Sequence, residues 1–289
     1  MAAPSPGTVR HRLLVQKLRR LREEAGFTQA EVAADMDWSE SKQIKIERGN
    51  IPVRLADVRA LLAHYGVSGP DRKEEADAIL KLTRDARQKG WWHTYGDAVP
   101  IWFEPFLGLE TEATSIRTYQ TELVHGLLQT SDYYRAFVNM SSTLINEEEI
   151  EHKVAVRAKR QSRLESGSAP DYWTIMNEAT LRRIPENTAM MRNQLEYIIE
   201  RMELPPVTVQ VLPFNAGMHP AMDGPFEILS FPESLDLDVV YLESQTCALY
   251  LEEKPQVARY NAIFDQLRAK ALDPDDSRKL ITRILQEAT

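Results

Sequence analysis

Residues 39–48 place small polar and basic side chains along one short predicted helix. Short polar residues at the start of such a helix let it enter a DNA major groove and reach the donors and acceptors of the base edges. Basic residues beside them attract phosphates. Thr28 and Gln29 open the preceding helix, where exposed backbone N–H groups suit an anion. The candidate DNA-contacting residues are Thr28, Gln29, Ser39, Glu40, Ser41, Lys42, Lys45 and Arg48.

The sequence contains no comparably clear pattern of residues for catalysis. The 6 histidines include no HExxH motif and no paired metal-ligand spacing, and the sequence contains no Walker, GxGxxG or GxSxG motif. His219 and Asp223 come nearest to an acid–base pair, but a turn histidine beside a proline is more often structural. We therefore expect no enzyme activity, no metal site and no cofactor.

A second group of residues, in the C-terminal two-thirds, is typical of a site for a partner or ligand. Glu243 ends a predicted strand and is expected to pair with an arginine at 157, 160 or 163, or else to contact a ligand. The aromatic residues at 91–106 either form a domain core or line a pocket or partner groove. The tentative residues of this site are Trp91, Trp92, Trp102, His125, Arg157, Arg160, His219 and Glu243.

Local signals define the helices that must position the first group. A basic amphipathic helix is predicted at 9–25 and ends at Gly26. Thr28 and Glu31 have capping-box spacing, so a short helix should follow. After a tight turn Ser39 caps the next helix, at 40–48, and a fourth helix is predicted at 54–65. These residues predict a small all-helical unit containing a helix-turn-helix.

Charge is unevenly distributed over the 289 residues, whose net charge is −8. Residues 8–65 contain 11 Lys/Arg and 8 Asp/Glu, whereas the rest contains 24 and 35. A basic head on an acidic body suits a protein that contacts phosphate at one end, although a charged helix face is also simply solvated. The single cysteine, Cys247, excludes an intramolecular disulfide. With no apolar run typical of a membrane span or signal peptide, we expect a cytoplasmic protein without membrane contact.

The composition changes twice after the helical unit. Residues 1–68 are predicted as the first domain, 69–90 as a charged linker helix, and 91–289 as a second domain for signal or partner binding and dimerisation. Helical patterns occur in the second domain at 104–118, 127–139, 146–166, 188–202, 255–272 and 277–287. Strand patterns occur at 119–124, 172–176, 207–212, 226–230, 237–242 and 248–251. The last four strands follow one another closely, which favours an antiparallel meander in an α+β domain.

The N-terminal residues resemble XRE-type helix-turn-helix regulators, relatives of phage repressors. The resemblance rests on Gly26-Phe27-Thr28-Gln29, Val32-Ala33, Asp37-Trp38-Ser39 and Ile46-Glu47-Arg48-Gly49. It implies that Gln29 binds a backbone phosphate and that an Arg22–Glu47 ion pair ties the first helix to the third. It also implies that Ser39, Glu40, Ser41 and Lys45 face the bases. Gln43 stands where the family usually has Val or Ile, so either the third helix is rotated or a polar side chain is partly buried there.

The C-terminal part resembles an actinobacterial regulator family described as WhiJ-like or antitoxin-like. The resemblance rests on residues 123–134 and 211–219 together with Arg157, Arg160 and Gln161, with His125 where the family usually has Pro. It implies a transcriptional regulator that binds double-stranded operator DNA as a homodimer and responds to a ligand or to a small protein encoded nearby. The alternative is an antitoxin-like protein whose main role is binding that small partner. The expected fold is mainly α: a phage-repressor-like all-α domain, then an α+β domain with an antiparallel sheet.

Overall fold

The computed structural model of the chain describes residues 9–85, 91–141, 146–183, 188–232 and 238–287. The chain divides into two compact units, Met1–His93 with Glu104–Leu109 and Thr94–Phe103 with Glu110–Thr289. The first is helical and the second is α+β, which confirms the predicted fold class. Within the described ranges, no helix combines the length and the apolar character needed to cross a membrane.

The helices of the first unit begin and end close to the predicted caps. Its helices are α1 (Val9–Glu24), α2 (Gln29–Asp35), α3 (Glu40–Glu47), α4 (Leu55–His64), η1 (Pro70–Arg72) and α5 (Lys73–Asp85). Their shared core includes Leu18 of α1, Ile46 of α3, Leu61 of α4 and Ile79 of α5, all buried. Burial of these apolar side chains holds the short helices together, since helices this short are marginal alone.

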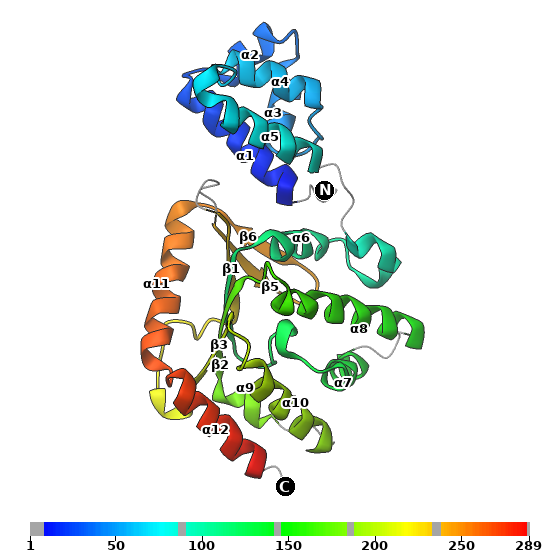
Figure 1. Cartoon of the computed structure of the whole chain (residues 1–289), viewed down its shortest axis with the longest axis vertical. Helices are drawn as coiled ribbons and strands as arrows, with labels where there is room; N and C mark the ends of the chain where they lie inside the picture. Colours follow the sequence, from blue (N-terminus) through cyan, green and yellow to red (C-terminus); the bar gives the residue numbers. More distant parts are fainter. Residues whose placement is uncertain (1–8, 86–90, 142–145, 184–187, 233–237, 288–289) are drawn as a thin grey trace. The chain divides into compact units, whose positions relative to one another are not determined.

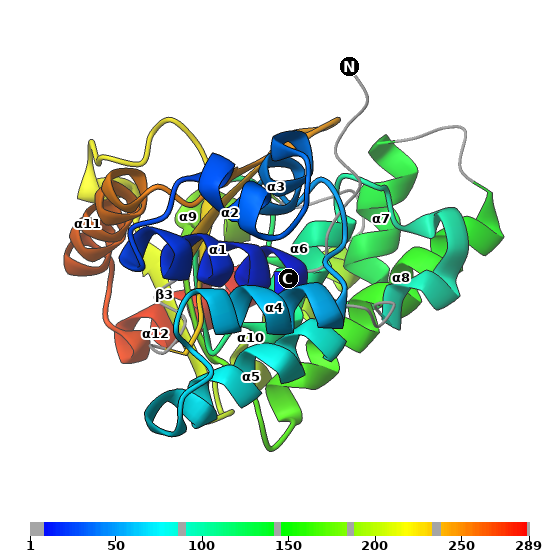
Figure 2. The ribbon, with the colours of Figure 1, turned by 90° about the horizontal axis from the view of Figure 1, so that it is seen from above.

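The segment predicted as a linker helix is part of the first unit over Lys73–Asp85. Helix α5 lies alongside α1 and α4 (Figures 1 and 2), and Ile79 points into their core. The sequence interpretation missed this packing because few of its positions are apolar, yet Ile79 and the half-buried Ala76 and Leu80 suffice for one contact face. Residues 86–90 of the predicted linker lie outside the described residues, and the exact domain boundaries stay a prediction.

The second unit is built on a six-stranded sheet of order β3-β2-β1-β4-β5-β6. The strands are β1 (Ser115–Gln120), β2 (Asp171–Asn177), β3 (Val207–Leu212), β4 (Phe226–Ser230), β5 (Asp238–Glu243) and β6 (Ala248–Leu251). The remaining helices are α6 (Glu104–Glu112), which spans the division between the units, α7 (Ser131–Ser141), α8 (Glu147–Gln161), α9 (Glu178–Arg182), α10 (Thr188–Arg201), α11 (Lys254–Lys270) and α12 (Pro274–Glu287). Short 3-10 helices are η2 (Trp91–Ala98), η3 (Gly126–Leu128), η4 (Ser162–Glu165) and η5 (Phe214–Ala216).

Two predicted details of the sheet are wrong. The first strand begins at Ser115, earlier than the predicted 119–124, and α6 ends at Glu112 instead of continuing to 118. Strand β3 does not join the meander, which consists of β4, β5 and β6; it pairs parallel with β2 at the opposite edge. Closeness in sequence favoured the meander, but a strand followed by helix and strand, as β2, α10 and β3 are, normally gives parallel pairing.

The two faces of the sheet have different characters. Helix α11 covers one face, and α7 and α8 lie over the other (Figure 1). The α11 face is mainly apolar, with Tyr119, Ile228 and Val240 in one core cluster with Phe264. On the α8 face the strand register aligns one polar row across five strands: Thr174, Thr118, Glu227, Tyr241 and Tyr250.

The β3 edge of the sheet is occupied by the chain around the start of α12. Leu272 N donates to the Val211 carbonyl at 2.9 Å, and Val211 N donates to Ser277 Oγ at 2.9 Å. The Gln210 side chain also donates to the Leu272 carbonyl at 2.8 Å. These bonds satisfy backbone groups that an edge strand otherwise exposes.

Candidate nucleic-acid interface

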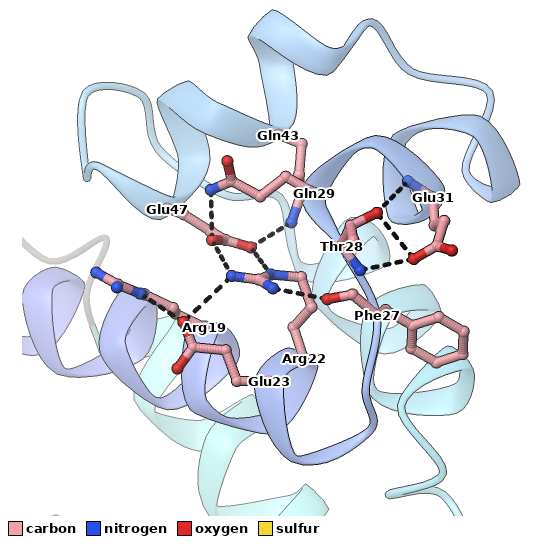
Figure 3. Close-up of polar contacts among 9 residues, drawn as sticks. All are labelled: Arg19, Arg22, Glu23, Phe27, Thr28, Gln29, Glu31, Gln43 and Glu47. Atoms are coloured by element: carbon pink, nitrogen blue, oxygen red, sulfur yellow. Dashed lines mark hydrogen bonds and ion pairs between the residues drawn. The ribbon is translucent and has the colours of Figure 1, made fainter.

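A buried ion pair joins α1 to α3 (Figure 3). Arg22 Nε and Nη2 donate to the two carboxylate oxygens of Glu47 at 2.6 and 3.0 Å. The two side chains are only 10% and 3% exposed. Arg22 Nη1 also donates to the Phe27 carbonyl, in the loop before α2, at 2.7 Å. Because the planar guanidinium matches the carboxylate fork, this pair fixes the direction as well as the distance between the helices.

Two glutamine side chains complete the shell around Glu47. Gln29 Nε2 donates to Oε2 and Gln43 Nε2 donates to Oε1, both at 2.7 Å. With the two bonds from Arg22, the carboxylate accepts about as many hydrogen bonds as its lone pairs allow. Burial by itself would raise the pKa of Glu47, but the bonds from Arg22, Gln29 and Gln43 outweigh it and lower that pKa. A charged Glu47 therefore connects α1, α2 and α3 in one network.

The unusual glutamine of α3 is explained by this network. Gln43 is buried, and its amide serves the Glu47 carboxylate instead of packing against apolar neighbours. Nearby Tyr65 is also buried, and desolvation followed by the Glu47 charge raises the pKa of its hydroxyl. The inner side of α3 is thus partly polar, which explains why its apolar pattern is weak in the sequence.

Side-chain caps fix where α2 and α3 begin. Thr28 Oγ1 accepts a hydrogen bond from Glu31 N at 3.2 Å, and Glu31 Oε2 accepts one from Thr28 N at 2.8 Å, forming the predicted capping box. Ser39 Oγ accepts from Lys42 N at 3.2 Å. Between the helices Asp37 adopts a left-handed backbone with φ 55°, which Asp tolerates better than most residues. The tight turn and both caps therefore follow from local residue choice.

The outer side of α3 presents polar and basic groups in one stripe. Ser41, Lys45 and Arg48 are exposed and follow one another at spacings of four and three residues, so they share a helix face. Ser39 and Glu40 are exposed at its start. Over the described residues, Lys45 and Arg48 form no ion pair with a carboxylate, so both cations are available to an external anion.

Two predicted DNA contacts are engaged within the unit itself. Lys42 Nζ lies 3.5 Å from the Trp38 ring centroid and 3.5 Å from Asp57 Oδ2, so this half-buried side chain is directed toward α4. Gln29, predicted to bind a phosphate, instead donates to Glu47. Thr28 is exposed, but its hydroxyl is used by the capping box.

The basic stripe of α1 is also largely paired. Lys17 contacts Glu75 at 2.9 Å, Arg19 contacts Glu23 at 2.9 Å and Arg20 contacts Glu24 at 2.7 Å. These pairs reduce the local excess of positive charge that the N-terminal sequence indicated. The positive charge available to an external anion therefore lies mainly on α3.

Ile44 is a residue of the outer face that the sequence interpretation missed. Ile44 and Ile46 are the apolar residues of α3, but Ile46 is buried whereas Ile44 is only half-buried. Ile44 follows Gln43 by about 100° around the helix, so burial of Gln43 turns Ile44 outward, toward Ser41 and Lys45. The signal was present in the sequence, since only one of two residues flanking Lys45 can face the core.

Several of the tentative second-site residues meet over the α8 face of the sheet. Arg160 Nε and Nη2 each donate to Glu110 at 2.7 Å, in a pair whose side chains are 5% and 4% exposed. His125 Nε2 lies 3.1 Å from Glu227 Oε1, and His125 Nδ1 lies 2.7 Å from the Tyr172 hydroxyl. Glu110 was not anticipated as the partner of Arg160, because neighbouring acids in α6 gave no reason to single it out.

Glu243 lies near these arginines but bonds to a neighbour in its own strand. The Tyr241 hydroxyl donates to Glu243 Oε2 at 2.9 Å. Desolvation raises the pKa of the Glu243 carboxyl despite that bond and despite the charges of Arg160 and Arg157. A carboxyl with a raised pKa is one whose charge the surroundings compensate poorly.

His219 contacts the opposite face of the sheet, whereas Trp102 lies beside Tyr250, the β6 member of the polar row on the α8 face. His219 Nε2 is 3.2 Å from the hydroxyl of Tyr119, which belongs to the α11 face, and its Nδ1 accepts from Ala221 N at 3.3 Å. Trp91 and Trp92, in the first unit, contact each other edge to face at 5.9 Å. Trp102, in the second unit, stacks edge-on with Phe103 at 5.7 Å and accepts a hydrogen bond from the Tyr250 hydroxyl at its carbonyl.

Comparison with known proteins identifies both parts of the chain. The family described as a helix-turn-helix domain matches residues 13–74, which contain most of α1, all of α2 to α4 and the Glu47 network. The family described as a domain of unknown function (DUF5753) matches residues 103–283, the greater part of the chain. No curated protein and no solved structure matches it significantly.

Proposed function

Because the chain belongs to the DUF5753 family and carries a helix-turn-helix domain before it, we propose that it is a sequence-specific transcriptional regulator. In this proposal α3 enters the major groove of double-stranded operator DNA, and the second unit receives a signal from a ligand or partner. Helix-turn-helix domains dock their second helix in this way.

The exposed face of α3 is the observation that supports DNA reading. Ser41, Lys45 and Arg48 share that face, while Glu47 on the opposite side is locked to α1 and α2. A helix held rigidly behind and polar in front can place side chains on base edges with little loss of freedom on binding. Arg and Lys are the residues that most often contact guanine in the major groove.

Dimerisation is a further part of the proposal. A single small module buries only about 600–1,000 Å² on DNA, so specific binding usually requires two copies on a near-palindromic site. We propose a cytoplasmic homodimer of the XRE type, with half-sites about one helical turn apart. The WhiJ-like resemblance supports a signal-receiving role for the second unit and gives no operator sequence.

A footprint with variants of α3 tests the proposal. Lys45→Ala should weaken binding of the full chain to DNA from its own upstream region by about tenfold, since one base contact contributes roughly 1–3 kcal/mol. Binding to unrelated DNA should change far less. Gel shifts over a salt series measure both affinities, and Lys159→Ala, an exposed lysine of α8, is the matched control.

A second variant tests the outward apolar residue. If Ile44 contacts a thymine methyl group, Ile44→Ser should remove the preference for thymine at one operator position while leaving the other positions unchanged. Selection of bound sequences from a randomised operator measures this. An unchanged preference at every position would place Ile44 outside the DNA contact.

The same footprint distinguishes the antitoxin-like alternative. A protected near-palindrome whose binding Lys45→Ala weakens, with far less change on unrelated DNA, supports the regulator. Sequence-blind binding, with a salt slope that is equal on all DNA, would contradict it. The role of the second unit would then be sought in a small partner protein that co-purifies with the chain.

A further inference from the structure

Arg157 of α8 is held in a defined position in the second unit but forms no ion pair with a carboxylate of the described residues. Among the described residues no carboxylate lies within ion-pair distance of its guanidinium, and its Nε is buried without a hydrogen-bond partner. Burial, followed by the charge of Arg160, lowers its pKa. Arg157 as a residue is half-buried, so its guanidinium is partly removed from water. An anion nearby stabilises such a group, because desolvation of an unpaired charge is unfavourable.

Three carboxylates of the second unit each contact a group other than Arg157. Glu110 is bound at both oxygens by Arg160. Glu227 lies against His125, and Glu243 accepts the Tyr241 hydroxyl. The protein therefore places two guanidinium groups side by side and supplies a bidentate carboxylate to only one of them.

The position of the Arg157 guanidinium is fixed by its neighbours. Its central carbon lies 3.9 Å from the centroid of the Tyr134 ring. On the chain at Gly126, an added Cβ would lie 2.3 Å from Arg157 Nη1 and 3.1 Å from Arg160 Nη1. Only glycine allows the backbone to approach both arginines so closely. A fork held in this way loses little rotamer freedom on binding an anion.

The sheet beside this pair offers further polar groups. Gly126 follows His125, which contacts Glu227 in the polar row of the α8 face. In that row Thr174 Oγ1 and Glu227 Oε2 are buried without hydrogen-bond partners among the described residues. Buried polar atoms are usually satisfied, so two unpaired ones in the row that His125 contacts favour this part of the sheet as a place that binds something polar.

We propose that Arg157 is the anion-binding residue of a ligand site on the α8 face, and that the ligand carries a carboxylate or phosphate group. Both groups accept the two parallel N–H bonds that a guanidinium offers. The assignment deepens the proposed function by giving the signal of the second unit a chemical class. Its biological use rests on that function, but anion binding does not depend on DNA binding.

Calorimetric melting of the full chain tests the site with two probes, inorganic phosphate and succinate, each against sodium chloride of equal ionic strength. A ligand that binds only the folded form should raise the Tm of the second unit by about 5 °C when it is well above its Kd. Arg157→Gln should abolish the rise. Gly126→Ala should abolish it as well, because the new methyl group displaces the guanidinium while keeping its charge. Arg192→Gln, on the exposed side of α10, is the control and should keep it.

The outcomes show which anionic group the site prefers and whether the site exists. A rise with phosphate alone, or with succinate alone, supports the site and names the group that it prefers. A rise that persists in Arg157→Gln or in Gly126→Ala, or that is absent for both probes in the wild type, overturns it. An equal loss in Arg192→Gln also overturns it, since the effect would then be general screening. Gel shifts on the same samples report DNA binding separately. Failure of the regulator proposal can therefore be distinguished from failure of the anion site.

Discussion

Glu47→Gln should destabilise the helix-turn-helix unit by about 3–5 kcal/mol, because it leaves a buried arginine without its counter-charge. The amide has the same size as the carboxylate, so no cavity is created. One acceptor oxygen becomes a donor, however, and it then faces the donors of Arg22, Gln29 or Gln43. Denaturant melting of the full chain, followed by tryptophan fluorescence, to which Trp38 of this unit contributes, and by far-ultraviolet dichroism, measures the change.

Glu23→Gln is the matched control for this substitution. Glu23 accepts a bond from Arg19 at 2.9 Å and lies 3.4 Å from Arg22 Nη2, but its side chain is 52% exposed. Exposed pairs contribute little, so this variant should retain the wild-type midpoint. Equal stabilities of the two variants would show that the Glu47 network does not hold the unit together.

The pH dependence gives an independent check on Glu47. A carboxyl whose pKa is lowered on folding contributes stability above its unfolded pKa, and that stability is lost as the pH falls through the folded value. The wild type should therefore weaken on acidification below about pH 4, near the unfolded pKa of glutamate. Glu47→Gln should lack this part of the acid sensitivity. It should also bind the operator poorly at temperatures where it is folded, because α3 is no longer fixed.

Glu110→Gln should destabilise the second unit by a similar amount, about 3–5 kcal/mol. Its carboxylate is the bidentate partner of buried Arg160, and the charge of Arg160 with its hydrogen bonds lowers the pKa of Glu110 against the effect of burial. Arg163 of η4 also bonds to the backbone carbonyls of Glu110 and Ala113, so the end of α6 is held by both α8 and η4. Calorimetry of the full chain measures the loss in the second unit.

A control variant in a surface ion pair of α8 and a double variant test whether the effect is specific to Glu110. Glu149→Gln, whose partner Lys153 lies 3.3 Å away on the same helix, should change the stability little. Adding Arg157→Gln to Glu110→Gln should recover part of the loss, because it removes one of two neighbouring uncompensated guanidinium groups. Losses that simply add in the double variant would contradict a shared electrostatic origin.

The helical unit was predictable from sequence because its determinants are local. Gly26 ends α1, the Thr28–Glu31 box opens α2 and Ser39 opens α3, each within a few residues of the boundary that it defines. A cap acts over three or four residues, so no knowledge of distant packing is needed. The resemblance to XRE regulators named Arg22 and Glu47 together, and the structure places them in contact.

The sheet was less predictable because its order depends on distant pairing. Strand β1 is central and covered on both faces, with Ile116 and Tyr119 buried on opposite sides, so it lacks the alternation of a half-exposed strand. Strand β3 pairs with β2 across an intervening helix instead of with the next strand along the chain. Neither relation leaves a short-range signal.

The candidate sites also contain some features set by local sequence and others set by contacts between distant residues. The outward face of α3 follows from helical spacing, but the fate of Gln43 and Ile44 depended on whether a buried carboxylate needed an amide donor. The engagement of Gln29 by Glu47, and of Lys42 by Trp38 and Asp57, joins residues from different helices. The pairing of Arg160 with Glu110, 50 positions away, likewise had no local mark.

The unequal edges of the sheet limit how copies of this protein can associate. At β3 the Val211 backbone is already bonded to Leu272 and Ser277, so its N–H and carbonyl are not available to a strand from another molecule. Strand β6, of only four residues, is the other end of the sheet. Edge-to-edge association is then favoured at β6, and a contact between identical edges closes on itself after two copies. Occupation of the β3 edge at Val211 thus works against a sheet that continues from molecule to molecule, which is the route to fibres.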